Sequence, residues 1–313
     1  MKKILIAVAG YFKPQKYEGS VYKNRPSDII FHTINITILL LITLICIIPF
    51  YFLLVNTLSS YYYVSRNLVR FWPRGWTFEN YLVLFDVGDF WQALWITVAR
   101  TVIGTAAMVL VSAFAGYIFS KRTMWQRKLF YRMVIIPMFF NAGMIPWFVT
   151  MMSLGLTDNF LGFIIPMMLA PFNIILVKTY IESLPKEMEE SAKIDGAGIL
   201  TIFFKMMLPM SIPILATITI FGAVAHWNSL QDSLILMMNR QDLYVLQHRL
   251  FIHMTQEAQL RESLARSGAV GAIRDLRVVQ YTLAMTTALP IILVYPLLQR
   301  FFIKGIMVGA VKG

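Results

Sequence analysis

The chain has 313 residues, of which 58% are hydrophobic and only 14% are charged. Soluble domains carry about a quarter charged residues, so this composition excludes an ordinary soluble protein and indicates an integral membrane protein. The net charge is +12, but no run of Lys and Arg interleaved with aromatic residues lies in a polar domain, which argues against nucleic-acid binding. Four His and a single Cys argue against a metal site.

Residues 1–30 are predicted to form a cytoplasmic tail. Two lysines and a short apolar stretch, residues 4–10, look like a signal peptide, but Lys13 and Lys16 follow at once. A retained tail or an interfacial helix fits this pattern better. The first span then acts as an uncleaved signal-anchor.

Six segments are apolar over about 18 residues or more, the length at which a helix crosses a bilayer. Since backbone groups in lipid must be paired within the segment, each is predicted to be a helix. The region 31–313 is therefore expected to be one six-helix, all-α transmembrane domain. The segments are 34–55, 93–119, 133–152, 160–177, 208–227 and 281–298.

The distribution of Lys and Arg predicts the orientation of these spans. With the N-terminus inside, the inner segments hold 18 basic residues and the outer segments hold 9. This bias favours both termini in the cytoplasm, a cytoplasmic loop at 181–209 and an extracellular loop at 231–280. Prolines inside the spans predict kinked helices: Pro49, Pro137, Pro146, Pro166, Pro171, Pro213, Pro290 and Pro296.

The polar loop 181–209 is predicted to contain two short helices. Pro185 suits a helix start, and the acidic residues that follow lie near its positive dipole end. Ala192 and Gly196 are four residues apart, so we expect them to share a helical face that a partner backbone can approach closely. Gly196 suits a left-handed turn before a second helix at 199–207. Pro209 is expected to break the helix where the fifth span begins.

This loop resembles the coupling-loop signature of importer-type ABC permeases: Glu-Ala-Ala, three residues, Gly, nine residues, then Ile-x-Leu-Pro. Glu190-Ser191-Ala192 and Gly196 are followed after nine residues by Met206-Met207-Leu208-Pro209. Ser191 replaces an Ala, and Met206 replaces the Ile. The resemblance assigns ATPase coupling to Glu189, Glu190, Ser191, Ala192, Asp195, Gly196, Ala197, Leu208 and Pro209.

Four further stretches extend the resemblance over residues 27–313. They resemble the sugar-type permeases, which include the second permease of the maltose importer, and more closely the "Lpl" subgroup associated with oligosaccharides from polysaccharide lyases. The stretches are Asn141–Pro146 (Gly-Gly-x-Ile-Pro), His226–Ser229 with Asp232 (Trp-Asn-x-Trp/Phe-x-Asp), Leu243–Gln247 (Leu-Tyr-Pro-Leu-Gln) and Gln299–Gly305 with the closing Lys312-Gly313.

The resemblance implies a type I ABC importer permease fold in a bacterial cell membrane, and a transport role rather than an enzymatic one. It implies a second homologous permease, two ATPase subunits, an extracellular substrate-binding lipoprotein and an oligosaccharide substrate. The chain has no Gly-x4-Gly-Lys-Ser/Thr phosphate loop, so ATP and Mg²⁺ are expected on the ATPase and no cofactor on this chain.

The two outer loops suit a receptor role. Loop 56–92 is rich in aromatic residues, which form either an interfacial belt or a contact with the binding protein or a sugar. Loop 231–280 carries six arginines and, by the resemblance, reaches toward the sugar cleft of the binding protein. The alternative for 231–280 is a solvated excursion without a specific contact.

Arg100 is the charged residue of the second span and is predicted to lie near the bilayer midplane. An intramembrane Arg usually faces a cavity or pairs with another group. Three alternative roles are therefore expected for Arg100. It contacts a polar or anionic sugar, it forms a structural pair with a carbonyl or a partner-subunit acid, or its side chain extends (snorkels) to the outer interface. The other pathway candidates have an interhelical or interfacial role as the alternative: Asn141, Asn173, His226, Trp227, Asn228 and Asp232.

Three other functions stay open. A secondary transporter usually shows repeated halves and protonatable acids within its spans, and neither feature is evident here. An intramembrane enzyme would need a catalytic set at membrane depth. An ABC permease for a non-sugar solute differs only in cargo.

Overall fold

The computed structural model describes residues 26–86, 89–140, 142–185, 187–255 and 276–310. Two compact units divide the chain, residues 1–51 and 52–313. Helix α2, Pro26–Thr57, begins in the first unit and is the first predicted span. Its large apolar side chains are exposed from Ile30 to Phe52, as expected for a helix solvated by lipid rather than by a protein core.

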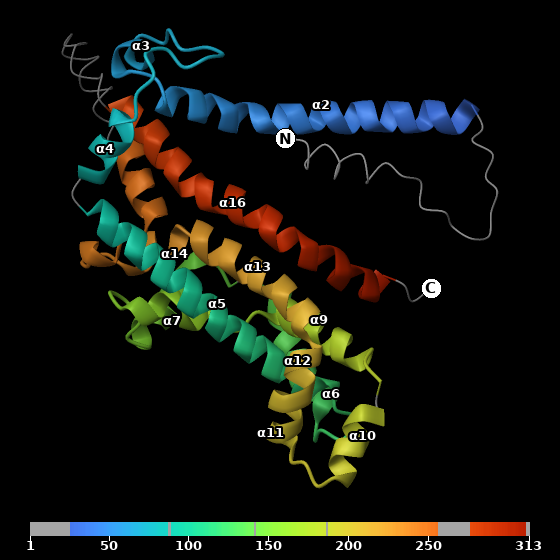
Figure 1. Ribbon diagram of the computed structural model, residues 1–313. Coiled ribbons are helices and arrows are strands. Elements are labelled where there is room, and N and C mark those ends of the chain that lie inside the picture. The colour runs from blue at the N-terminus through green and yellow to red at the C-terminus, as the bar shows by residue number, and fades with distance from the viewer. Residues whose placement is uncertain (1–25, 87–88, 141, 186, 256–275, 311–313) are drawn as a thin grey trace. The chain divides into compact units, whose positions relative to one another are not determined.

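The second unit is built around α5, which spans Phe90–Ser120. Along its length α5 packs against α9 (Pro171–Glu182) and α13 (Ile212–Asn228), and α13 also packs against α16 (Leu276–Ala310) (Figure 1). These four helices form the scaffold on which both candidate sites are placed.

Close packing of α5 on α13 depends on a small residue at position 104. A Cβ added to Gly104 would lie 2.3 Å from the imidazole of His226. Small residues are typical where two membrane helices approach closely. His226 is therefore fully buried in this helix–helix contact.

Within the described part of the chain, the first and second predicted spans are single uninterrupted helices long and apolar enough to cross a bilayer. Among the described residues, two further spans are possible if each of two bent helix pairs counts as one. In the fourth predicted span, η2 (Phe160–Phe163) and α8 (Ile165–Met168) precede α9 at an angle of 45°. The break falls at Ala170, whose extended backbone is that expected before Pro171.

The fifth predicted span is also bent. The stretch Ile199–Met210 meets α13 at 79°, with Ser211 between them. The sequence predicts this bend at Pro209, and the structure places it two residues further on, at Ser211. Pro213 lacks the N–H that would continue the helical hydrogen bonds across this junction.

The third predicted span, 133–152, is not one helix, and this prediction was wrong. Helix α6 (Arg127–Ile135) is followed by η1 (Ile136–Met138), and α7 begins at Met144 and ends at Ser153. Pro137 in η1 removes a backbone donor at the point where the helix ends.

The first part of the loop after α13 is folded and does not extend into solvent. It folds into α14 (Gln231–Leu236) and η4 (Gln241–Leu243) and then a helix over 246–255. Leu236, Met237 and Leu246 are fully buried in the core of the second unit. Residues 231–255 of this predicted extracellular loop are thus part of the folded second unit.

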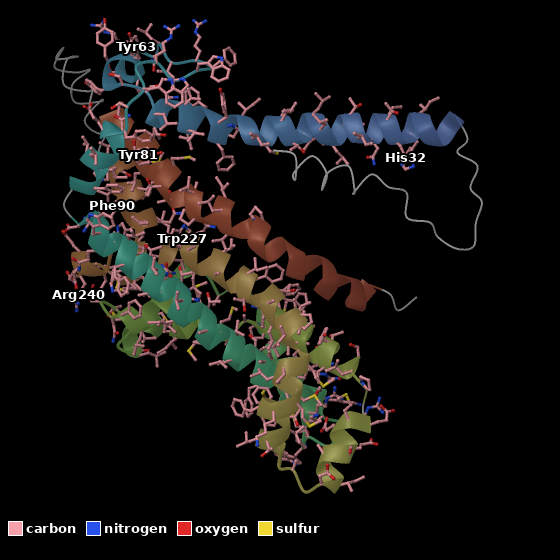
Figure 2. The ribbon with its side chains drawn as sticks, in the orientation of Figure 1. His32, Tyr63, Tyr81, Phe90, Trp227 and Arg240 are labelled. Atoms are coloured by element: carbon pink, nitrogen blue, oxygen red, sulfur yellow. The ribbon has the colours of Figure 1, made fainter. Side chains whose placement is uncertain are left out.

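The aromatic loop between α2 and α5 is held by backbone and amide hydrogen bonds. It contains α3 (Tyr61–Ser65) and α4 (Glu79–Asp86). The amide of Asn80 donates to the carbonyls of Thr57 and Ser59, both at 2.8 Å. Around this frame Tyr62, Phe71, Trp72, Trp76 and Phe78 remain exposed, as the side chains near the label Tyr63 in Figure 2 illustrate.

Candidate coupling and pathway sites

The polar loop forms a helix–turn–helix, as predicted. Helix α10 spans Glu187–Ile194 and α11 spans Ile199–Ile202, and both lie at the end of α5 opposite α4 (Figure 1). Three acidic residues occupy the first turn of α10, where the helix dipole favours negative charge.

Gly196 ends α10 with a left-handed turn, also as predicted. Its φ is +80°, and its N–H donates to the carbonyl of Lys193 at 3.0 Å. The N–H of Ala197 donates to the carbonyl of Ala192 at 2.9 Å. These two bonds form a Schellman cap, which satisfies carbonyls that the helix end leaves open.

Glu189 anchors α10 to the C-terminal end of α5. Its carboxylate accepts a hydrogen bond from Lys121, the residue that follows α5, and pairs with Lys193 at 2.9 Å. Burial raises the pKa of Glu189, but the hydrogen bonds from both lysines outweigh burial and lower this pKa overall. Half-burial lowers the pKa of Lys121, and the bond to Glu189 opposes that shift.

Ala192 does not present a surface to a partner, and this part of the prediction was wrong. It is buried in a core cluster with Tyr117 of α5, Ile181 of α9 and Ile202 of α11. Because α10 ends at Ile194, Gly196 lies beyond the helix and the two residues share no helical face. The small side chain at 192 lets α10 pack closely on its own chain.

The outer face of the turn exposes apolar side chains that the sequence analysis did not single out. Ile194 is 87% exposed, and Ile199 and Leu200 are 65% and 58% exposed. Among these, Ile194 could have been noticed as an isolated large apolar residue in a charged segment. We call Ile194, Ile199 and Leu200 the apolar tip.

The other predicted coupling residues lie around this tip or behind it. Glu190, Ser191 and Asp195 are exposed on α10 and its end. Behind α11 the chain continues through the π-helix η3 (Phe203–Met207) into α12 (Leu208–Met210), which contains Leu208 and Pro209. Leu208 and Ala197 pack against the same core cluster as Ala192.

Arg100 pairs with Asp232 of the same chain, 132 positions away. Its Nη2 donates to Asp232 Oδ2 at 2.5 Å, and its Nη1 donates to Oδ1 at 3.3 Å and to the Ser229 carbonyl at 3.3 Å. The Arg100 side chain is fully buried, with its guanidinium carbon 4.5 Å from the centre of the Phe163 ring. Two pathway candidates, one from the second predicted span and one from the loop after the fifth, thus meet in one bidentate pair.

Asp232 is also held by its own loop. Its Oδ1 accepts from the Ser229 hydroxyl and from the Ser233 N–H, both at 2.9 Å. The Ser233 hydroxyl in turn shares a hydrogen bond of 2.9 Å with Nδ1 of His248. This network ties α5 to α14 and to the helix over 246–255, through the kind of hydrogen bonds that accompany buried polar groups.

His226 is buried against Gly104, one turn of α5 beyond Arg100, and the other described pathway candidates make their contacts away from this pair. Trp227, labelled on α13 in Figure 2, is buried and its indole N–H donates to the Thr287 carbonyl of α16 at 2.9 Å. Asn173 is buried and lies 3.2 Å from the sulfur of Met108, while Asn228 is exposed and accepts a long bond from Gln247. Asn141 lies outside the described residues.

Known proteins resemble this chain in sequence and in structure. The profile of the family "Binding-protein-dependent transport system inner membrane component" matches residues 108–308. Two Bacillus subtilis (strain 168) proteins are each 32% identical over 93% of this chain: the polygalacturonan/rhamnogalacturonan transport system permease protein YtcP, covered over 100% of its length, and Protein LplC, covered over 97%.

Among solved structures, this chain is similar to a chain of a bacterial ABC transporter involved in the import of the acidic polysaccharide alginate. The TM-score is 0.79 at 29% identity, over 89% of this chain and 98% of that one. The matched profile covers well over half of the sequence and reaches from α5 to α16. The chain therefore belongs to the family of inner-membrane components of binding-protein-dependent transport systems.

Proposed function

We propose that this chain is a transmembrane subunit of an ATP-binding-cassette importer that carries an oligosaccharide from polysaccharide breakdown into a bacterial cell. It forms half of the pathway with a second, homologous permease. Two ATPase subunits drive the cycle, and an extracellular binding lipoprotein delivers the sugar. Six spans and cytoplasmic termini are part of this proposal.

Several named relatives support the cargo. YtcP is named for polygalacturonan and rhamnogalacturonan, and the structural neighbour for the acidic polysaccharide alginate. A further relative, AraQ of Bacillus subtilis (strain 168), is named for arabinooligosaccharides and is 25% identical over 88% of this chain. Names for sugar polymers and oligomers recur, which favours a saccharide over an ion, a peptide or an amino acid.

The apolar tip is the observation that carries the coupling role. Ile194 is almost fully exposed on a turn that is itself fixed to the protein by Glu189 and Ala192. An exposed apolar cluster on a fixed support is typical of a protein–protein contact. A subunit that grips this turn would move α10 and α5 together, because the Lys121–Glu189 bond joins them. ATP and Mg²⁺ would be bound by that subunit.

Co-purification tests the coupling role. The chain is co-expressed with a second permease and the ATPase subunits of its importer, and the ATPase retained on the tagged complex is measured. Ile194→Glu places a charge in the contact and is expected to remove the ATPase and sugar uptake while the permease melting temperature stays unchanged. Leu154→Glu, at another exposed apolar residue just after α7, is the control and retains the ATPase. Full retention by Ile194→Glu rules the coupling surface out.

The side of the membrane is tested with a single cysteine. Cys46 is the only cysteine, so Ser191→Cys in a Cys46→Ser background gives one exposed thiol beside the apolar tip. A membrane-impermeant maleimide is expected to label this thiol only after the cells are opened. Leu154→Cys, on the opposite side in the proposed topology, is labelled in intact cells. Labelling of Ser191→Cys in intact cells contradicts the proposed orientation.

A further inference from the structure

A cavity of about 380 Å³ lies beside the Arg100–Asp232 pair. Its wall comes from α7, from η2 and α8, and from the turn that leads into α14. Helix α14 is in contact with both α7 and η2, so segments about 80 residues apart in the chain close around one space. In the proposed topology all three segments lie in the outer half of the membrane.

The lining combines an aromatic face with polar groups. Trp147 of α7 contributes a half-buried indole, and Gln231 contributes an exposed amide. Asp232 also lines the space. The Asp232 Oδ2 accepts one bond from the described residues, that of Arg100, and a carboxylate oxygen can accept two. Asp232 therefore has acceptor capacity that no described residue uses.

This combination matches the chemistry of a sugar ring. The C–H face of a sugar packs on an indole, while its hydroxyls need both donors and acceptors. Trp147 offers the apolar surface, and Gln231 and Asp232 offer the hydrogen-bonding groups. The second cavity beside α13, of about 210 Å³, is lined almost entirely by aliphatic residues with Trp227 and offers no comparable set.

We propose that the Trp147 cavity is a subsite that holds one sugar unit at one end of the transported oligosaccharide. This inference rests on the proposed function. The volume lies at the low end of the range for small-molecule sites, roughly 300–1,000 Å³, so the cavity takes one end of the chain rather than the whole molecule. Because an acidic residue, Asp232, lines the cavity, the bound edge carries hydroxyl groups rather than a uronate carboxylate.

Direct binding tests the subsite. Short tritiated oligosaccharides of polygalacturonan, of rhamnogalacturonan and of alginate are titrated onto the purified permease–ATPase complex in lipid nanodiscs, without the binding protein. Gln231→Ala is expected to weaken binding about tenfold, the loss of one hydrogen bond. Trp147→Ala is expected to weaken binding further, and Trp147→Phe to restore most of it.

Two controls separate the outcomes. Trp95→Ala removes an exposed tryptophan of α5 that does not line the cavity, and it leaves binding unchanged. One outcome is that the unaltered complex takes up sugar in proteoliposomes while Gln231→Ala and Trp147→Ala bind the oligosaccharides with the same affinity as the unaltered complex. In that case the subsite is wrong and the proposed function stands. If the unaltered complex neither takes up nor binds any of the probes, both are wrong. If Gln231→Ala instead releases the second permease, the cavity is an interface and the subsite is wrong.

Discussion

Two positions along α5 hold their charges in opposite ways. Arg100, about a third of the way along the helix, is fully buried and is paired within the chain by Asp232, with Ser229 completing the contact. Lys121, at the C-terminal end of the helix, is partly exposed and meets Glu189, which is itself partly exposed. The two charged residues are 21 positions apart, or about 32 Å along a helix.

This difference separates a junction enclosed in the protein from one at its surface. A buried ion pair has lost its water, so both of its members must come from the folded chain. A partly exposed pair is still in contact with water, so it can join two elements at a surface that also meets a partner. Together with the apolar tip, this makes the Lys121 end the side of the molecule suited to a partner that binds and moves.

Breaking the buried pair is expected to have the largest effect. Arg100→Leu leaves the Asp232 carboxylate buried without its partner, which costs about 3–5 kcal/mol. We expect a large fall in melting temperature in detergent and loss of folded protein from the membrane.

The matched variants show whether charge burial is the cause. The double variant Arg100→Leu/Asp232→Leu removes both charges and is expected to recover most of the stability. Arg240→Leu breaks the pair with Asp242, in which both side chains are about half exposed, and is expected to leave the melting temperature unchanged. A single variant as stable as the double one contradicts this reading of the Arg100 pair.

A substitution behind the apolar tip is expected to have the next largest effect. Ala192→Leu forces three extra carbons into the core cluster that joins α10 to α5, which costs about 1–3 kcal/mol. The exposed neighbour Ser191→Leu is the control and should not change the melting temperature. If Ala192→Leu melts normally but no longer binds the ATPase, then Ala192 faces the partner and the packing described here is wrong.

The sequence predicted those parts of the fold that depend on local composition. Uninterrupted apolar runs identified α2 and α5, and the acidic first turn and Gly196 identified α10 and its cap. The breaks in the third, fourth and fifth predicted spans were harder to predict from the sequence. Proline marks where a helix can bend, as at Ala170 before Pro171, but it gives neither the angle nor the residue, and the fifth span bends at Ser211 rather than at Pro209.

The candidate sites show the same division. A spacing of four places Ala192 and Gly196 on one face only while the helix continues, and α10 ends between them. Asp232 and Arg100 were both singled out, but their pairing joins residues 132 positions apart and follows from tertiary structure alone. Lys121, Trp147 and Gln231 carried no motif, because their roles arise from what the fold places opposite them.

The turn at Gly196 is expected to have a smaller effect. A Cβ at this position meets no atom within 4 Å, so Gly196→Ala adds backbone strain alone, about 1–2 kcal/mol for a left-handed residue. Faster amide hydrogen exchange at Ala197, with the global melting temperature little changed, is the expected result. Gly196→Asn tolerates this conformation better and should lie between the two. Equal exchange in Gly196→Ala and the unaltered protein contradicts the strained turn.

The Glu189 anchor is expected to have the smallest effect, and one that depends on pH. The pKa of Glu189 is lowered in the folded protein because the hydrogen bonds from Lys121 and Lys193 outweigh burial. A lowered folded pKa means that the stabilisation is complete above the ordinary Glu value, about 4.3, and is lost as the pH falls through the lowered value. The melting temperature of Glu189→Gln should therefore lie below that of the unaltered protein at pH 7, and the two curves should converge in acid. Glu190→Gln removes an adjacent exposed charge and controls for the change in net charge. If the difference in melting temperature between Glu189→Gln and the unaltered protein persists unchanged into acid, the carboxylate does not anchor α10 through its charge. The contact between α10 and this end of α5 would then depend on the packing of Ala192 alone.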